Sequence, residues 1–366
     1  MSQIVIVGCG VVGAMIAYEL SRISGLAITV VDRQPPAQAA TGAALGVLMG
    51  VISQKIKGRA WQMRLDSIQR YNTLIPELQK LTSREVPFNQ QGILLLCDAD
   101  ENLDQWKTLA NVRAAQDLQL EILDLEQVRA SYPQICTDPF SAAIYSPQDR
   151  QVEPTALTLA LVDAASRNGV AFEFGVEAEV IPASNSDGNN LHSVSQVQTN
   201  FGTLDCDWLI IAAGLGSTPL TTALAQPLEI KPVLGQALEV QLEQPLGLVQ
   251  PVITAHDVHV VPVGQSNYWI GATVEFLGDA PEPIADATRL QAVMRQAVAF
   301  CPGLVKAEIL RSWSGLRPRP EGRPAPVIGS LPGYSNVLLA TGHYRNGVLL
   351  APATAQAICS TIVQDY

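Results

Sequence analysis

The sequence of residues 4–13 is Ile4-Val5-Ile6-Val7-Gly8-Cys9-Gly10-Val11-Val12-Gly13. The apolar run at its start predicts a strand, and the glycines predict a tight turn into a helix that continues to Arg22. A second apolar run, residues 27–31, ends at Asp32, about 20 residues after the glycines. This order is typical of a dinucleotide-binding βαβ unit, in which the acid binds ribose hydroxyls. The glycines let the backbone approach a pyrophosphate at the helix N-terminus.

Two further segments favour a flavin, although the N-terminal pattern alone would fit a nicotinamide enzyme equally well. Residues 41–48 are small or apolar and follow the second strand, which suits close approach of the backbone to a bulky flat ligand. Residues 209–216 are an apolar run that passes into glycines, as expected of a parallel strand whose carboxyl end faces a ligand. A tight interdomain turn and an ordinary strand-to-loop transition stay open as alternatives.

Two arginines near the C-terminus, Arg317 and Arg345, lie in neutral surroundings rich in glycine and proline. Arg317 precedes Pro318, and Arg345 lies between a predicted strand, residues 336–340, and a predicted helix, residues 348–363. We expect tight turns to hold both guanidinium groups as rigid forks of donors for a carboxylate. Internal ion pairs are the alternative for both arginines.

The C-terminal segments also carry a resemblance to a known family. Residues 315–318, 326–329 and 340–354 are similar to the tail of glycine oxidases of the thiamine-biosynthesis type, within the flavin-dependent oxidases related to D-amino-acid oxidase. The resemblance covers most of the chain. It implies FAD as the cofactor, a small amino acid or secondary amine acid as the substrate, and dioxygen as the electron acceptor. Because residues 311–316 contain no cysteine where sarcosine oxidases attach their flavin, we predict non-covalent FAD.

The resemblance implies roles for individual residues. Arg317 would bind the substrate carboxylate, and His259 stands where glycine oxidases usually have a tyrosine that helps to hold it; a buried structural histidine is the alternative. The residues predicted to be catalytic are Arg317, Arg345 and His259. The residues predicted to bind the cofactor are Gly8, Gly10, Gly13, Asp32, Arg33, Thr41, Ala43, Ala44, Gly46, Leu48, Val176, Ala213, Gly214, Gly342, Arg345, Asn346, Gly347, Val348 and Leu349. A helix that begins near Gly347 would point its positive end at the flavin pyrimidine edge.

The implied reaction is oxidative deamination of a glycine-, sarcosine- or D-amino-acid-type substrate by hydride transfer to flavin N5. The imine would then hydrolyse to an oxo acid, and dioxygen would be reduced to hydrogen peroxide. Positioning alone can lower such a barrier by roughly 7 to 11 kcal/mol, so no side-chain base is required. Three alternatives stay open: a flavin dehydrogenase that passes electrons to a quinone or protein, a nicotinamide-dependent dehydrogenase, and a non-catalytic FAD-binding protein.

The alternation of patterns predicts an α/β fold, with a Rossmann-like FAD-binding domain and an α+β substrate domain built on an antiparallel sheet. We assign residues 1–85, 150–225 and 312–366 to the FAD-binding domain, and residues 86–149 and 226–311 to the substrate domain. Strands are expected at residues 234–242, 258–263 and 268–274, with a helix from Asp286 to Phe300. Residues 59–81 should form a helix that Pro76 kinks or breaks. Residues 185–190 read as a polar hairpin tip.

Composition limits the classes of function. The 366 residues, 48% hydrophobic and 16% charged, suit a globular enzyme, and a formal net charge of -11 argues against a nucleic-acid surface. The six cysteines show neither metal-ligand spacing nor a disulfide framework, so we predict no metal site and a reducing cytoplasm. We expect no membrane span, and a homo-oligomer is compatible with the composition.

Overall fold

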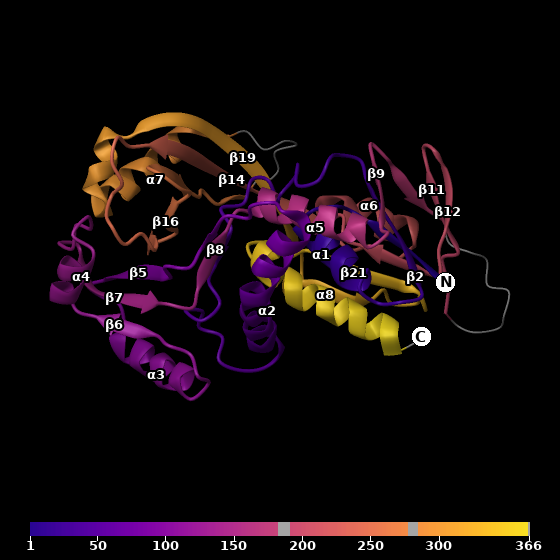
Figure 1. Cartoon of the computed structure of the whole chain (residues 1–366), viewed down its shortest axis with the longest axis horizontal. Helices are drawn as coiled ribbons and strands as arrows, with labels where there is room; N and C mark the ends of the chain where they lie inside the picture. The colour runs from indigo at the N-terminus through magenta and orange to yellow at the C-terminus, as the bar shows by residue number, and fades with distance from the viewer. Residues whose placement is uncertain (182–190, 277–284, 365–366) are drawn as a thin grey trace.

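The structure is a computed structural model that describes residues 1–181, 191–276 and 285–364, so the predicted hairpin tip at 185–190 lies outside the described residues. Two sheet-based regions lie side by side along the long axis of the molecule (Figure 1). The helices are α1 (Val11–Leu20), α2 (Arg59–Thr82), α3 (Leu103–Ala114), α4 (Leu125–Ser131), α5 (Pro154–Arg167), α6 (Ser217–Ala223), α7 (Ala287–Phe300) and α8 (Gly347–Gln364), with 3-10 turns η1 (Gly214–Gly216) and η2 (Pro302–Lys306).

The first region is built on a six-stranded sheet. In spatial order its strands are β20 (Val327–Ser330), β21 (Val337–Thr341), β13 (Trp208–Ile211), β1 (Ser2–Val7), β2 (Leu26–Asp32) and β9 (Ala171–Phe174). All neighbours are parallel except β20, which is antiparallel to β21. The carboxyl ends of β1, β13 and β21 therefore meet at one edge of the sheet, which is where ligands bind in such folds.

Both faces of this sheet are buried, which explains its nearly continuous apolar strands. Ile4 and Ile6 belong, on one face, to a core cluster that also contains residues of α1, α2, α5 and α8. Val5 and Val7, which alternate with them, pack on the other face in a cluster that includes Leu220 of α6. A small sheet of β10 (Ala178–Val180), β11 (Gln196–Thr199) and β12 (Gly202–Asp205) adds to that second face.

The second region is built on a nine-stranded sheet. In spatial order its strands are β18 (Glu275–Phe276), β14 (Ile230–Gln241), β17 (Asn267–Gly271), β16 (Val258–Pro262), β15 (Val252–Ala255), β5 (Ile93–Asp98), β7 (Phe140–Ser146) and β6 (Glu121–Leu123), and β19 (Glu308–Pro320) pairs with β14. The neighbours are antiparallel except β15 and β5, so the prediction of a second region on a mainly antiparallel sheet is confirmed. A short sheet consists of β3 (Val47–Leu48), β8 (Arg150–Val152) and β4 (Phe88–Asn89), and β8 lies between the two regions in Figure 1.

The two faces of the nine-stranded sheet have different neighbours. Leu238, Tyr268 and Ile270 pack on one face in a core that includes residues of α7, whose N-cap is Asp286 as predicted. Ala237 and Trp269 alternate with them and contact the N-terminal region through a small cluster. That cluster contains Leu45, with Val47 and Met49 packed against it. The second face therefore joins the two regions.

The prediction of a helix at residues 59–81 is confirmed: α2 is one helix from Arg59 to Thr82. Pro76 inside it does not break it, because buried Leu74, Ile75 and Leu78 hold the turns on either side, and a kink at Pro76 stays a prediction. The prediction of a tight turn at Arg317 is wrong, because Arg317 lies in the second half of the long strand β19. The predicted domain boundaries stay predictions.

One described helix, α8, is long and apolar enough to cross a membrane by length and composition alone. Half of its window is buried inside the protein, and the helix packs against α1 and α2. Leu349, Leu350 and Ala351 belong to the main core. Packing within the fold therefore accounts for its apolar composition.

Candidate active site

The glycines after β1 are required by close backbone packing at the edge of the parallel sheet. Gly8 has φ of +109°, and a Cβ there would lie 2.5 Å from the carbonyl oxygen of Ala212, which follows β13. A Cβ on Gly13 would lie 1.9 Å from the carbonyl oxygen of Gly8. Gly10 is the N-cap of α1 and offers no side-chain cap. The turn and the helix start thus present backbone N–H groups, as a pyrophosphate requires.

Asp32 ends β2 beside this turn, as the sequence predicts. Its carboxylate accepts hydrogen bonds from the backbone N–H of Cys9, at 2.6 Å, and of Gln34, at 2.9 Å. Val176 donates its backbone N–H to the carbonyl oxygen of Asp32 at 3.0 Å, and Arg33 is exposed beside them. The residues predicted to bind the ribose and the adenine therefore lie close together. The Asp32 carboxylate keeps lone pairs that can accept hydrogen bonds from further donors.

The segment of small residues from Thr41 to Leu48 lies against this turn and against the nine-stranded sheet. The Thr41 hydroxyl accepts a hydrogen bond from the backbone N–H of Val11 at 3.1 Å. The carbonyl oxygen of Ala43 accepts one from the Trp313 indole at 3.1 Å. Gly46 has φ of +71°, and a Cβ there would lie 1.7 Å from the carbonyl oxygen of Val152. Leu48 is buried in the main core, so its side chain anchors the segment to that core.

The loop from β21 to α8 lies at the same edge of the parallel sheet. Gly342 has φ of +65° and Tyr344 φ of +53°, and the Tyr344 backbone N–H bonds the carbonyl oxygen of Pro318 at 3.0 Å. α8 begins at Gly347, as predicted, so Val348 and Leu349 lie in its first turn. Gly214 lies in the neighbouring turn after β13, where its carbonyl oxygen accepts a hydrogen bond from Thr341.

The guanidinium of Arg317 lies over Gly235 on the nine-stranded sheet. A Cβ on Gly235 would lie 2.4 Å from both terminal nitrogens of Arg317, so only glycine leaves room for this side chain. One of those nitrogens donates to the carbonyl oxygen of Leu234 at 3.1 Å. Burial lowers the pKa of Arg317 from its usual value, and Arg345 lowers it further. Among the described residues Arg317 makes no ion pair, which leaves donors for an anion.

Arg345 has a different environment. Its guanidinium donates to the carboxylate of Asp257 at 2.8 Å, and both side chains are partly exposed. The alternative left open by the sequence, an internal ion pair, is therefore what the structure shows for Arg345.

His259 lies on β16, where it faces Gly271 on β17 and Thr254 on β15. Its Nδ1 is 2.9 Å from the Thr254 hydroxyl. Burial first, and then the charge of Arg345, lower the pKa of His259 to about 4, so its imidazole is neutral at pH 7. His259, Arg317 and Arg345 are thus close enough to interact electrostatically, and the structure brings all three predicted catalytic residues together.

His343 is a structural residue. It is 4% exposed, and its Nε2 is 2.9 Å from the Thr354 hydroxyl on α8, so it shapes the loop that carries Arg345. Burial lowers the pKa of His343 from 6.5 to about 4.

This burial predicts acid sensitivity. As the pH falls from 6.5 toward 4, the unfolded chain takes up a proton on this histidine before the folded chain does, so stability present above pH 6.5 is lost in that window. We expect His343 to account for about 2 kcal/mol of the loss of unfolding free energy between pH 7 and pH 5. Urea denaturation of a His343→Gln variant should show a smaller loss over this range. Equal pH dependence in wild type and variant would contradict the assignment, and exposed His192→Gln is the control.

Sequence reasoning missed two residues of the site, Gly235 and Asp257. An isolated glycine within a strand pattern indicates that another group approaches closely, so the sequence could have predicted a close contact at Gly235. The residue that approaches it was not deducible from the sequence, and nothing marked Asp257.

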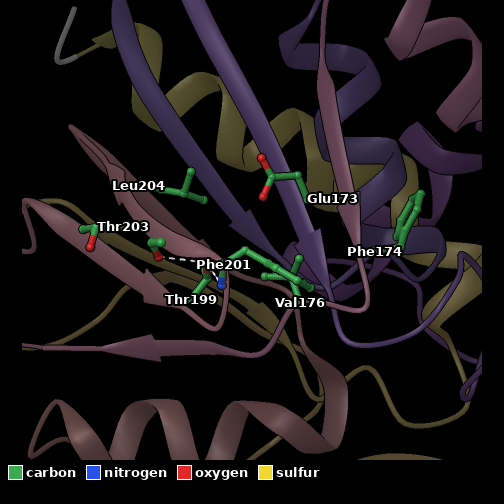
Figure 2. A pocket seen from close by; sticks show the side chains of 8 residues that line it. Glu173, Phe174, Val176, Thr199, Phe201, Thr203 and Leu204 are labelled. Atoms are coloured by element: carbon green, nitrogen blue, oxygen red, sulfur yellow. Dashed lines mark hydrogen bonds between the residues drawn. The ribbon is translucent and has the colours of Figure 1, made fainter.

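A pocket of about 430 Å³ lies away from the arginines, beside β9 and the β11–β12 hairpin. Figure 2 shows Phe174 and Val176 on one side and Thr199, Phe201 and Leu204 on the other. None of the three predicted catalytic residues lines it. Since Phe174 pairs with Asp32, the pocket adjoins the predicted adenine end of the cofactor site.

Comparison with known proteins agrees with this geometry. Residues 3–361 match the family model described as DAO, FAD dependent oxidoreductase. The chain is 31% identical to a bifunctional protein ThiO/ThiG of Synechocystis, over 100% of this chain and 52% of that protein, so it spans about half the length of this relative. It is 26% identical to a glycine oxidase of Geobacillus kaustophilus, over 98% of this chain and 92% of that protein.

A solved structure shows the same fold. The crystal structure of glycine oxidase from Bacillus cereus superimposes with a TM-score of 0.86 at 24% identity, and the match covers 100% of this chain and 96% of that chain. At this identity the likeness supports the architecture, a Rossmann-like FAD-binding region joined to a second region on an antiparallel sheet.

Proposed function

The chain belongs to the family of FAD-dependent oxidoreductases, and from that premise we propose that it oxidises a small amino acid or secondary amine that carries one carboxylate. Glycine, sarcosine and D-amino acids are the substrate types that we propose. A glycine oxidase activity of the thiamine-biosynthesis type is part of the proposal, because relatives over nearly the whole chain are named ThiO and glycine oxidase.

One observation carries the proposal: Arg317 presents a partly buried guanidinium that no carboxylate of the described residues neutralises. A carboxylate is the natural partner of a planar guanidinium, because two parallel N–H donors match its two oxygens. Trp313, four residues earlier on β19, bonds Ala43 in the predicted flavin-binding segment. A substrate held by Arg317 would therefore lie next to that segment.

The residues at the sheet edge fit FAD. The turn with Gly8 and Gly13 has no room for side chains, and two helices, α1 and α8, begin at the same edge. Gly8, Gly10 and Gly13 would hold the pyrophosphate, Asp32 the ribose, and the start of α8 the flavin pyrimidine. When bound, FAD supplies the hydride acceptor. Arg317 fixes the carboxylate and neutral His259 borders it, so the chain contributes binding and orientation and no obligatory base.

Non-covalent attachment of the cofactor gives a simple prediction. Trp313, Ser314 and Gly315 offer no nucleophile of the cysteine type, and the free cysteine Cys301 is buried in the core on the other face of the sheet. Acid precipitation should therefore release all yellow colour into the supernatant. A yellow pellet would show a covalent flavin and contradict the prediction.

The decisive experiment is anaerobic titration of the FAD-loaded protein with glycine, sarcosine, proline and both enantiomers of several amino acids, while the flavin band is followed. Bleaching by one of them supports the proposal and gives the substrate class. A yellow protein that none of them bleaches would contradict it. Admission of air then tests the acceptor: rapid recovery of the band with hydrogen peroxide supports an oxidase, and slow recovery favours the dehydrogenase alternative with a quinone or protein acceptor. The cytoplasmic location and the oligomeric state stay predictions.

A further inference from the structure

The Arg345–Asp257 ion pair connects the two regions of the molecule. Arg345 lies in the loop between β21 and α8 of the parallel-sheet region, and Asp257 lies in the turn between β15 and β16 of the other region. The bond between the guanidinium and the carboxylate is 2.8 Å long, and the side chains are 41% and 70% exposed. The pair therefore lies at the solvent-exposed edge of the site.

The Asp257 carboxylate also acts on the interior of the site. The hydrogen bond from Arg345 holds the pKa of Asp257 below its usual value, and the charges of Arg345 and Arg317 lower it further, so Asp257 is ionised at neutral pH. With His259 neutral, the two guanidinium groups and the one carboxylate give this cluster a net charge of +1.

Glu275, which also acts on Arg317, belongs to a separate network. It accepts hydrogen bonds from Gln236 and Thr273. On β14, Leu234 pairs with Glu275, and the preceding residue, Val233, pairs with Arg317. Successive residues of a strand point to opposite faces of the sheet, so the side chains of Glu275 and Arg317 lie on opposite faces. Glu275 therefore lies behind the sheet, and the charge that a substrate meets is that of Arg317, Arg345 and Asp257.

We propose that Asp257 is a specificity-determining residue, which occupies Arg345 and thereby restricts the site to substrates with a single carboxylate. The inference rests on the proposed role of Arg317 as the carboxylate-binding residue. One carboxylate on Arg317 neutralises the cluster. A second carboxylate on the substrate would compete with Asp257 for Arg345 and would meet its negative charge, because like charges at a binding site oppose each other.

The test is calorimetric binding to the FAD-loaded protein of two nearly isosteric acids, succinate with two carboxylates and succinamate with one. Wild type should bind succinamate more tightly. In Asp257→Asn, the affinity for succinate relative to succinamate should rise about twofold to fivefold, the range expected for an exposed charge pair. The matched control is Asp104→Asn, which removes an exposed aspartate from a 2.8 Å ion pair on α3 and should leave the ratio unchanged.

A double variant tests whether Asp257 changes the affinity for succinate through Arg345. If Asp257 acts by occupying Arg345, then Asp257→Asn combined with Arg345→Gln should lose the gain for succinate, because the freed guanidinium is gone. An unchanged ratio in Asp257→Asn would overturn the inference, and so would binding of neither acid to wild type. The readout is independent of turnover: a changed ratio in a protein whose flavin no amine bleaches would support the role of Asp257 and contradict the proposed oxidation.

Discussion

Substitution of Arg317 by alanine is expected to lower kcat/KM for the best substrate about 30-fold to several thousandfold, because truncating one partner of a buried charge pair costs about 2 to 5 kcal/mol. Most of the loss should appear as a raised KM, since Arg317 holds the carboxylate and not the reacting carbon. The flavin should stay bound, because the residues assigned to FAD lie on other elements. Steady-state kinetics with the substrate found by anaerobic titration measure the change.

Arg311 is the matched control for this substitution. It lies on the same strand β19, is 59% exposed, and pairs with Glu239 at 2.6 Å. Arg311→Ala should change kcat/KM little, because exposed ion pairs contribute at most about 1 kcal/mol. If Arg317→Ala kept the wild-type kcat and KM, Arg317 would not belong to the substrate site, and the observation that carries the proposed function would be lost.

The N-terminal cofactor region could be predicted from the sequence because its signals are local. The apolar run of β1, the glycines and the acid at Asp32 occur in order within one βαβ unit, and each element forms where its pattern predicts. The start of α8 at Gly347 and the cap of α7 at Asp286 follow from equally local rules.

The environment of Arg317 could not be predicted in this way. Its neighbours Gly315, Pro318 and Pro320 resemble turn residues, yet they lie in a strand of 13 residues. β19 pairs with β14 along its whole length, and prolines are tolerated in a strand whose other side needs no ladder. Pairing with a segment about 80 residues away overrode the local propensity. The two residues of the Arg345–Asp257 pair are 88 positions apart in the sequence, so no local pattern could predict their contact.

Replacement of Gly235 by alanine should reduce catalysis without touching the substrate. The added methyl group would overlap the Arg317 guanidinium, whose atoms would lie 2.4 to 2.5 Å from it. Because the guanidinium is the free end of a flexible side chain, it can move aside at little cost to folding. A displacement of about 1 Å in a positioning group can cost about 100-fold in rate. We therefore expect kcat/KM to fall about 100-fold, with unchanged flavin content and thermal stability.

A double variant separates this route from a general disturbance of β14. If Gly235→Ala acts only by moving Arg317, it should have no further effect on kcat/KM in an Arg317→Ala background, because the group that it displaces is absent. Additive losses would instead mean that the methyl group disturbs the sheet or the flavin directly. Non-additivity would show that a glycine on one strand sets the position of an arginine on the next, and that the substrate carboxylate is held by this pair of strands.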